Sequence, residues 1–229
     1  MRYDVILWDV DGTLLDFTYS QRLSISKCLE EIGVIATEEM IESYSAINEG
    51  WWKRLEKGEV TKAELLTGRF TDLFAKYEIG YEDVDAFRNR YETYLGEIFK
   101  YMDNSIEICK TLKGRVRQFV VTNGVTAPQM SKLKRAGFFD MMEDIFISEQ
   151  LGAPKPQKAF FERVFEKMPE VERERILIVG DSLSSDIRGG NNAGIDTCWY
   201  NPKGEINELG VITDYVIYDL KDVIRIVEG

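Results

Sequence analysis

Six short apolar runs, each closed by small or acidic residues, constrain the fold of this chain more than any other feature. They lie at Tyr3–Trp8, Arg117–Val121, Asp144–Ile147, Ile176–Val179, Thr197–Tyr200 and Tyr215–Ile217. Near-continuous hydrophobicity over so few residues is typical of strands that are buried on both faces of a parallel sheet. From residue 104 onward the runs alternate with amphipathic helical patterns. The sequence therefore predicts an α/β fold with a doubly wound, mostly parallel sheet.

The segment from residue 16 to residue 100 has a different character. It contains no proline, and its apolar residues recur at helical spacing. Thr61 and Glu64 have the spacing of a helix capping box. The economical interpretation is an all-helical insertion, residues 16–100, in an α/β core domain that comprises residues 1–15 and 101–229.

Charge and cysteine content limit the partners and the location that we expect. The 29 Lys and Arg against 40 Asp and Glu give a net charge of −11, which repels nucleic acid and acidic membrane surfaces. We also expect no membrane span and no signal peptide, because no apolar stretch approaches about 20 residues and the first residues lack a small-residue cleavage site. Cys28, Cys109 and Cys198 lie far apart and form no paired motif, which favours reduced thiols and a cytoplasmic protein.

The chain contains no histidine. This excludes Ser-His-Asp and Cys-His catalysis, zinc bound through imidazole, and imidazole acid–base chemistry. Any catalysis must use carboxylates, lysines, hydroxyls or a metal ion bound through oxygen, and oxygen ligands favour magnesium.

Two aspartates follow the first apolar run, in the segment Asp9-Val10-Asp11-Gly12-Thr13. Ligands of an open parallel sheet bind beyond the carboxyl ends of its strands, so we expect both carboxylates at the mouth of a crevice. With this spacing one carboxylate can attack a substrate while the other manages protons. A polar turn that closes the strand is the alternative interpretation of the motif by itself.

Two later segments carry groups that could bind phosphate. Thr122-Asn123-Gly124 ends the second run, where a hydroxyl and backbone N–H groups can donate to a phosphoryl oxygen. Lys155 lies between two prolines, which restrict the loop and could hold the ammonium over a charged site. A capped turn and a solvated lysine, respectively, are the alternatives.

A second pair of carboxylates follows another apolar run. Gly180 permits a tight exit from the strand, and Asp181 and Asp186 come next, five residues apart. Their oxygens suit Mg²⁺, which prefers octahedral oxygen coordination. The alternative is that they cap the following helix.

Together, these four motifs occur in one order at the carboxyl ends of separate predicted strands. In this the chain resembles the haloacid dehalogenase superfamily, whose four motifs they match across the α/β part. The helical insertion is similar to that superfamily's first type of cap. The resemblance implies a magnesium-dependent enzyme that acts on a small phosphate monoester through a phosphoryl-aspartate intermediate.

The resemblance also implies roles for the first and last motifs. Asp9 is the nucleophile, and Asp11 is the general acid and then the base. Asp181 binds Mg²⁺ together with Asp9 and the backbone carbonyl of Asp11.

The remaining roles concern the phosphoryl group and its charge. Thr122 and Asn123 bind the phosphoryl group, and Lys155 binds it too while neutralising charge on the nucleophile. Asp186 supports the lysine or a metal-bound water.

The substrate is less closely defined. Asp11 argues against a dehalogenase, whose members have no acid–base Asp two residues after the nucleophile. The segments Ala46–Trp52 and Gly68-Arg69-Phe70 are similar to bacterial house-cleaning pyrimidine 5′-nucleotidases, which implies nucleoside 5′-monophosphates. Packing between helices is the alternative explanation for Trp51 and Trp52.

Other functions stay open. A phosphatase or phosphomutase for phosphoglycolate or sugar phosphates would carry the same motifs. A phosphonatase needs a lysine in the cap to form a Schiff base, and the sequence marks none of the lysines there for that role. A phosphate-binding module without turnover belongs to a different class. The sequence leaves monomer or homodimer undetermined.

Overall fold

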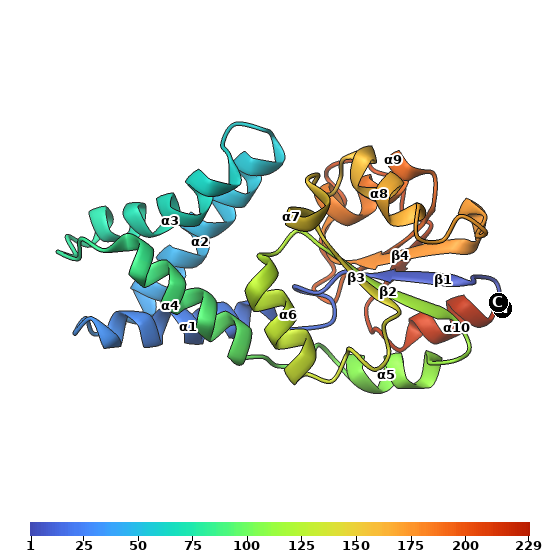
Figure 1. Cartoon of the computed structure of the whole chain (residues 1–229), viewed down its shortest axis with the longest axis horizontal. Helices are drawn as coiled ribbons and strands as arrows, with labels where there is room; N and C mark the ends of the chain where they lie inside the picture. The colour runs from blue at the N-terminus through green and yellow to red at the C-terminus, as the bar shows by residue number, and fades with distance from the viewer. The chain divides into compact units, whose positions relative to one another are not determined.

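The computed structural model describes all 229 residues, and its central feature is one six-stranded, all-parallel sheet (Figure 1). The strands are β1 (Val5–Trp8), β2 (Arg117–Thr122), β3 (Asp144–Ile147), β4 (Ile176–Gly180), β5 (Asp196–Tyr200) and β6 (Tyr215–Ile217). Their order is β3-β2-β1-β4-β5-β6. All six predicted strands are present, so the predicted α/β class with a parallel sheet is confirmed.

The first strand lies at the centre of the sheet and is buried on both faces. Leu7 pairs with Phe119 of β2 on one side and with Ile178 of β4 on the other. The chain winds outward from β1 to β3 and then returns to place β4 on the other side of β1. This reversal puts a topological switch point beside the carboxyl end of β1, where open α/β sheets bind their ligands.

Helices cover both faces of the sheet. Figure 1 shows α8 (Lys158–Phe165) and α9 (Arg188–Ala193) on one face, with α5 (Ser105–Leu112) and α10 (Asp222–Glu228) on the other. The α8 residues Phe160, Phe161 and Val164 are buried in the core against β1, β2 and β4. The remaining elements of this part are α6 (Thr126–Arg135), α7 (Ser148–Leu151), a 3₁₀ turn η1 (Arg173–Arg175) and a π-helical turn η2 (Leu183–Ile187).

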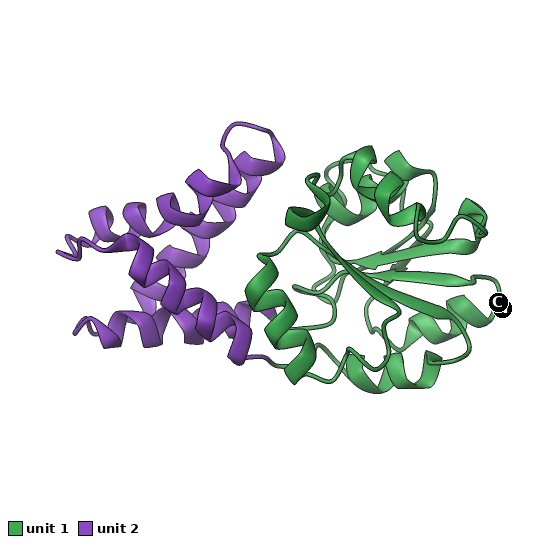
Figure 2. Ribbon diagram, in the orientation of Figure 1, with its two compact units in different colours: residues 1–16, 100–229 green, residues 17–99 purple.

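The chain forms two compact units (Figure 2). The α/β unit comprises residues 1–16 and 100–229, and the helical unit comprises residues 17–99. The helical unit consists of α1 (Phe17–Glu31), α2 (Glu38–Glu56), α3 (Lys62–Lys76) and α4 (Val84–Glu97).

Aromatic side chains form much of the core of the helical unit. The Tyr44 ring stacks on Phe70 with the centroids 5.5 Å apart, and Tyr91 meets both rings edge-on. The predicted capping box is present at the start of α3, where Thr61 and Glu64 exchange hydrogen bonds. A second core, separate from that of the sheet, is therefore built entirely within residues 17–99.

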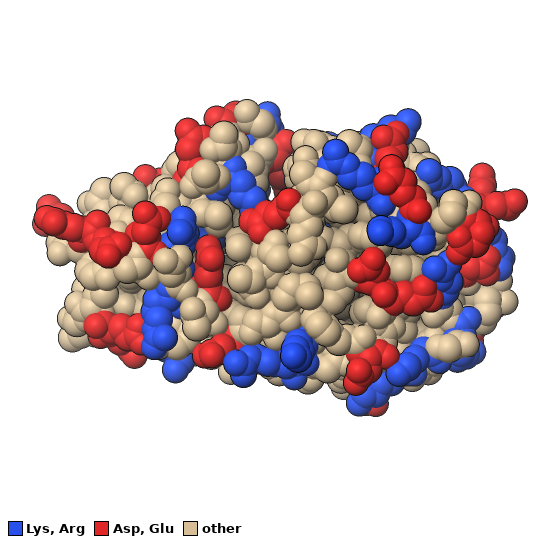
Figure 3. Space-filling model, viewed as in Figure 1, with Lys and Arg blue, Asp and Glu red and all other residues tan.

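No helix combines the length and the apolar character that crossing a bilayer requires. On the face drawn in Figure 3, basic side chains alternate with acidic ones and do not gather into a basic patch.

Candidate active site

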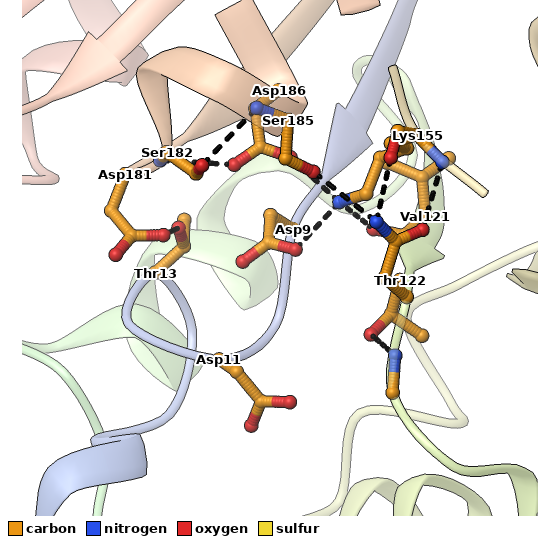
Figure 4. A network of polar contacts seen from close by, with 12 residues as sticks. Asp9, Asp11, Thr13, Val121, Thr122, Lys155, Asp181, Ser182, Ser185 and Asp186 are labelled. Atoms are coloured by element: carbon orange, nitrogen blue, oxygen red, sulfur yellow. Dashed lines mark hydrogen bonds and ion pairs between the residues drawn. The ribbon is translucent and has the colours of Figure 1, made fainter. Parts of the chain in front are cut away.

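Three adjacent strands carry three of the predicted site residues at their carboxyl ends, whereas Lys155 lies in the loop after α7 and Asp186 lies in η2. The strand β1 lies between β2 and β4. Neighbouring positions at the same sheet edge are therefore occupied by Asp9, Thr122 and Asp181. Figure 4 shows how these side chains meet.

Lys155 is the centre of the site. Its ammonium donates to Asp9 Oδ1 at 2.7 Å, to Asp186 Oδ1 at 2.6 Å and to the Val121 carbonyl at 2.7 Å. Three acceptors therefore satisfy its three protons, although the side chain is only 1% exposed. Burial by itself lowers the pKa of Lys155, but the charges of Asp186 and Asp9 more than offset this, so its pKa is raised and it stays cationic.

The carboxylates around this lysine repel one another. Burial, followed by the charge of Asp186, raises the pKa of Asp9 to about 7, although Lys155 acts in the opposite direction. Desolvation by the surrounding protein raises the pKa of Asp181 well above its usual range, and the charges of Asp9 and Asp186 add to this. Asp181 still has exposed surface, so we regard repulsion between the carboxylates as its more important cause. An additional positive charge would relieve this repulsion.

The oxygens of this cluster fit a hard cation. Carboxylate oxygens of Asp9, Asp181 and Asp186 lie within 4.8 Å of one another. Asp186 has both oxygens occupied, one by Lys155 and the other by the backbone N–H of Ser182 at 3.1 Å. Asp9 and Asp181 are therefore the carboxylates best suited to Mg²⁺, whereas Asp186 is placed to support the lysine.

Gly12 allows Asp181 to lie close to the loop after β1. Its backbone has φ of +96°, and a Cβ atom there would lie 2.3 Å from Asp181 Oδ2. The Thr13 hydroxyl donates to Asp181 Oδ1 at 3.4 Å, and the Trp199 indole N–H donates to the Asp181 carbonyl at 2.9 Å. The loop after β1 and the loop after β4 are thus held together at the proposed metal position.

The loop after β2 is hydrogen-bonded to the backbone of Lys155. The Asn123 amide accepts from the backbone N–H of Lys155 and donates to its carbonyl, both at 2.8 Å. A phosphate contact from Asn123 would therefore come from its backbone N–H, and its role in phosphate binding stays a prediction. The Thr122 hydroxyl oxygen accepts from the Gly124 N–H at 3.1 Å and keeps its own proton to donate.

Asp11 lies outside the lysine network, and Figure 4 shows its carboxyl group turned away from Asp9. Two side chains of α6 hold it: Gln129 donates to Asp11 Oδ2 and Lys132 donates to Asp11 Oδ1. Neither Gln129 nor Lys132 is among the site residues that the sequence predicts. The signal was their i, i+3 spacing, which places them on one helix face, but exposed polar residues have the same spacing.

The sequence profile of the haloacid dehalogenase-like hydrolases matches residues 3–194 of this chain. The HAD-hydrolase YfnB of Bacillus subtilis is 37% identical over 98% of this chain and 95% of its own. The crystal structure of YfnB, which is described as bound to magnesium and as revealing interdomain movement, superposes with a TM-score of 0.93 over 100% of both chains.

Two nucleotidases are similar over nearly the same length. The pyrimidine 5′-nucleotidase PynA of Streptococcus pneumoniae is 35% identical over 98% of this chain and 94% of its own. The pyrimidine 5′-nucleotidase YjjG of Escherichia coli is 30% identical over 97% of both chains. The profile match and these three relatives identify the family and agree with the fold. The chain belongs to the haloacid dehalogenase-like hydrolase family.

Proposed function

We propose that this protein is a magnesium-dependent phosphomonoester hydrolase that forms a phosphoryl-aspartate intermediate on Asp9. The observation that carries the proposal is the buried Lys155 ammonium, which joins Asp9 to Asp186 at the carboxyl edge of the sheet. A carboxylate held beside a permanent cation can receive an anionic phosphoryl group, because the cation offsets the charge that both bring.

The reaction has two displacements. An Asp9 oxygen attacks phosphorus, the bond to the ester oxygen breaks, and the leaving oxygen takes a proton from Asp11. Water then attacks the phosphoryl-aspartate, gives its proton to Asp11, and the bond between Asp9 and phosphorus breaks. Lys155 remains beside Asp9 throughout and stabilises the carboxylate that is regenerated.

Asp9, Asp181 and the backbone carbonyl of Asp11 are the groups that would hold Mg²⁺. When bound there, the ion supplies positive charge against the repulsion between the carboxylates and the substrate phosphate. The raised pKa values of Asp9 and Asp181 support this assignment, since burial and the charges of the neighbouring carboxylates both disfavour their ionised forms, and a bound cation would offset both effects. Thr122 and the backbone of Asn123 are proposed to donate to the phosphoryl oxygens.

We propose nucleoside 5′-monophosphates as the substrate class, with pyrimidine bases favoured. The similarity to PynA and YjjG over nearly the whole chain supports this choice. The helical unit, residues 17–99, is proposed to act as a cap domain that selects the leaving group, with residues 1–16 and 100–229 as the catalytic domain. A cytoplasmic location is proposed as well, supported by three cysteines that are all buried and unpaired.

The alternative is hydrolysis or transfer of phosphate on phosphoglycolate or sugar phosphates, for which the same site would serve. A phosphate-release screen with Mg²⁺ across nucleoside monophosphates, sugar phosphates and phosphoglycolate decides between them by kcat/KM. We expect the highest value for a pyrimidine nucleoside monophosphate.

Two controls test the mechanism in the same screen. EDTA should abolish activity and added Mg²⁺ should restore it. Asp9→Asn should remove nearly all turnover while the far-ultraviolet circular dichroism is unchanged, because an amide cannot form the acyl phosphate. Full activity in EDTA or in Asp9→Asn contradicts the mechanism, and absence of turnover with every substrate favours a binding module.

A further inference from the structure

We propose that Gln129 and Lys132 are positioning residues that orient the Asp11 carboxyl group for proton transfer. This inference rests on the proposed function, in which Asp11 gives a proton to the leaving oxygen and later takes one from water. It adds two residues of α6 that none of the four motifs contains.

One hydrogen bond to each of its two oxygens fixes the Asp11 carboxyl group. Gln129 Nε2 donates to one oxygen of Asp11 and Lys132 Nζ donates to the other. Two donors on two oxygens restrict the rotation of the carboxyl plane as well as the position of the side chain. Proton transfer requires a short, aligned hydrogen bond, and a carboxyl group held in this way spends less time in unproductive orientations.

Both donors are buried, which is unusual for their residue types. Gln129 is 2% exposed, and the Lys132 side chain is 5% exposed against 25% for Asp11. A buried ammonium requires an acidic partner, and Asp11 is the partner here. A buried cation of α6 is therefore held against the partly exposed carboxylate of Asp11.

The Gln129 amide shows that this contact is specific. Its Nε2 donates to Asp11, whereas its Oε1 is buried and has no hydrogen-bond partner. Turning the amide over would bring Oε1 against the Asp11 carboxylate, and two acceptors repel each other. The Gln129 amide thus donates to Asp11 while its own oxygen stays without a hydrogen bond.

Gly124 provides the space for this arrangement. A Cβ atom at residue 124 would lie 2.0 Å from Gln129 Nε2. Any side chain larger than hydrogen would displace the amide that holds Asp11. The glycine that ends the Thr122-Asn123-Gly124 motif therefore serves Asp11, in addition to closing the turn after β2.

The hydrogen bonds that hold Asp11 are separate from those of Lys155. Figure 4 shows that the hydrogen bonds of Lys155 reach Asp9, Asp186 and Val121 of β2, and that Asp11 lies apart from them. The nucleophile and the proton donor are thus held by two separate sets of residues. Changes in α6 should affect proton transfer without affecting the nucleophile.

The test uses this separation. Lys132→Met and Gln129→Leu preserve side-chain volume and remove the donors, and Lys134→Met, an exposed lysine on the same helix, is the matched control. Activity is measured with UMP, whose alkoxide leaving group needs a proton, and with p-nitrophenyl phosphate, whose phenolate leaves without one. The ratio kcat/KM reports the first displacement alone for both substrates.

We expect kcat/KM for UMP to fall about 100-fold in each variant, the usual size of a general-acid effect. With p-nitrophenyl phosphate the fall should be about 3-fold or less, and Mg²⁺ affinity measured by calorimetry should not change. Lys134→Met should behave as the wild type with both substrates. Equal losses for both substrates, or no loss, overturn the proposal.

A separate measurement covers the case in which the proposed function itself is wrong. If the wild type hydrolyses neither substrate, crystal structures of the wild type and of Gln129→Leu decide the matter. The Asp11 carboxyl group should lose its fixed position in the variant. An unmoved carboxyl group overturns the inference, whatever the activity of the protein.

Discussion

The Lys155 ammonium lies 2.7 Å from Asp9 Oδ1 at the carboxyl edge of the sheet, and both side chains are buried there. The same ammonium lies 2.6 Å from Asp186 Oδ1, so one cation serves two carboxylates. Removing that cation leaves two buried carboxylates without a counter-charge, and this has consequences for stability as well as for activity.

Lys155→Met should destabilise the protein by about 3–5 kcal/mol, the usual cost of breaking a buried ion pair from one side. It should also lower kcat by a factor on the order of 10²–10³. Urea unfolding and phosphate release measure the two effects. Asp186→Asn is the matched variant: it removes one carboxylate but keeps the cation, so its loss of stability should be smaller. Wild-type stability in Lys155→Met would contradict the arrangement described here.

Asp11→Asn should lose turnover of UMP by about 10²–10⁴-fold, because the amide can neither give nor take the proton. Mg²⁺ binding should persist, since the proposed metal contact at this residue is the backbone carbonyl. Phosphoenzyme should accumulate in acid-quench experiments with p-nitrophenyl phosphate, as the water of the second displacement has lost its base. A variant that retained the wild-type kcat with UMP would remove Asp11 from the mechanism.

The raised pKa of Asp9 makes stability depend on pH in a defined direction. Its pKa is about 7 in the folded, metal-free protein and near 3.8 ordinarily. Between these values the folded state binds more protons than the unfolded state, so this contribution to stability is present at pH 4 and is lost as the pH rises to 7. Because Mg²⁺ can take the place of the proton on Asp9, added Mg²⁺ should restore the stability that is lost as the pH rises.

Thermal unfolding with and without 5 mM Mg²⁺, roughly a saturating concentration, measures this effect. The increase in Tm caused by Mg²⁺ should be larger at pH 7.5 than at pH 5 by about 3 °C or more, since 1 kcal/mol shifts Tm by about 2–4 °C in a chain of this size. Asp9→Asn should show a much smaller pH dependence. An equal Mg²⁺ effect at both pH values would rule out Asp9 as a ligand that exchanges a proton for the ion.

The two tryptophans of α2 should respond differently to truncation. The Trp51 ring packs directly on Gly68 of α3, where an added Cβ would lie 2.3 Å from the ring, and its indole N–H donates to Asp72 at 2.8 Å. Trp51→Ala should therefore cost about 2–3 kcal/mol of stability, somewhat below the value for a fully buried tryptophan. Its kcat/KM for UMP and for p-nitrophenyl phosphate should change together.

Trp52 has a different environment, with the Lys62 ammonium 5.8 Å from its ring centroid. Trp52→Ala should leave Tm within about 2 °C of the wild type. If its ring stacks on the base, KM should rise for UMP and not for p-nitrophenyl phosphate. Parallel changes in both KM values would show that Trp52 does not select the nucleoside.

The sequence by itself determined the sheet and the position of the site within it. Short apolar runs such as Ile176–Val179 can be satisfied only by burial on both faces, and this forces a parallel sheet with helices on each side. The acidic and hydroxyl residues that end those runs then gather at one edge, because the carboxyl ends of parallel strands point the same way. The capping box of Thr61 and Glu64 could also be predicted from the sequence, since its hydrogen bonds join residues only three apart.

Only the tertiary structure decided which polar side chains face the site. Asp11 and Lys132 are 121 residues apart, and Asn123 and Lys155 are 32 apart, so their contacts depend on how the loops and α6 pack on the sheet. In sequence, Lys132 looks like a solvated lysine of an ordinary surface helix, because periodicity records spacing and not which way a helix face is turned. In the structure that helix face meets the loop after β1, and the Asp11 carboxylate in that loop offsets the cost of burying the Lys132 ammonium.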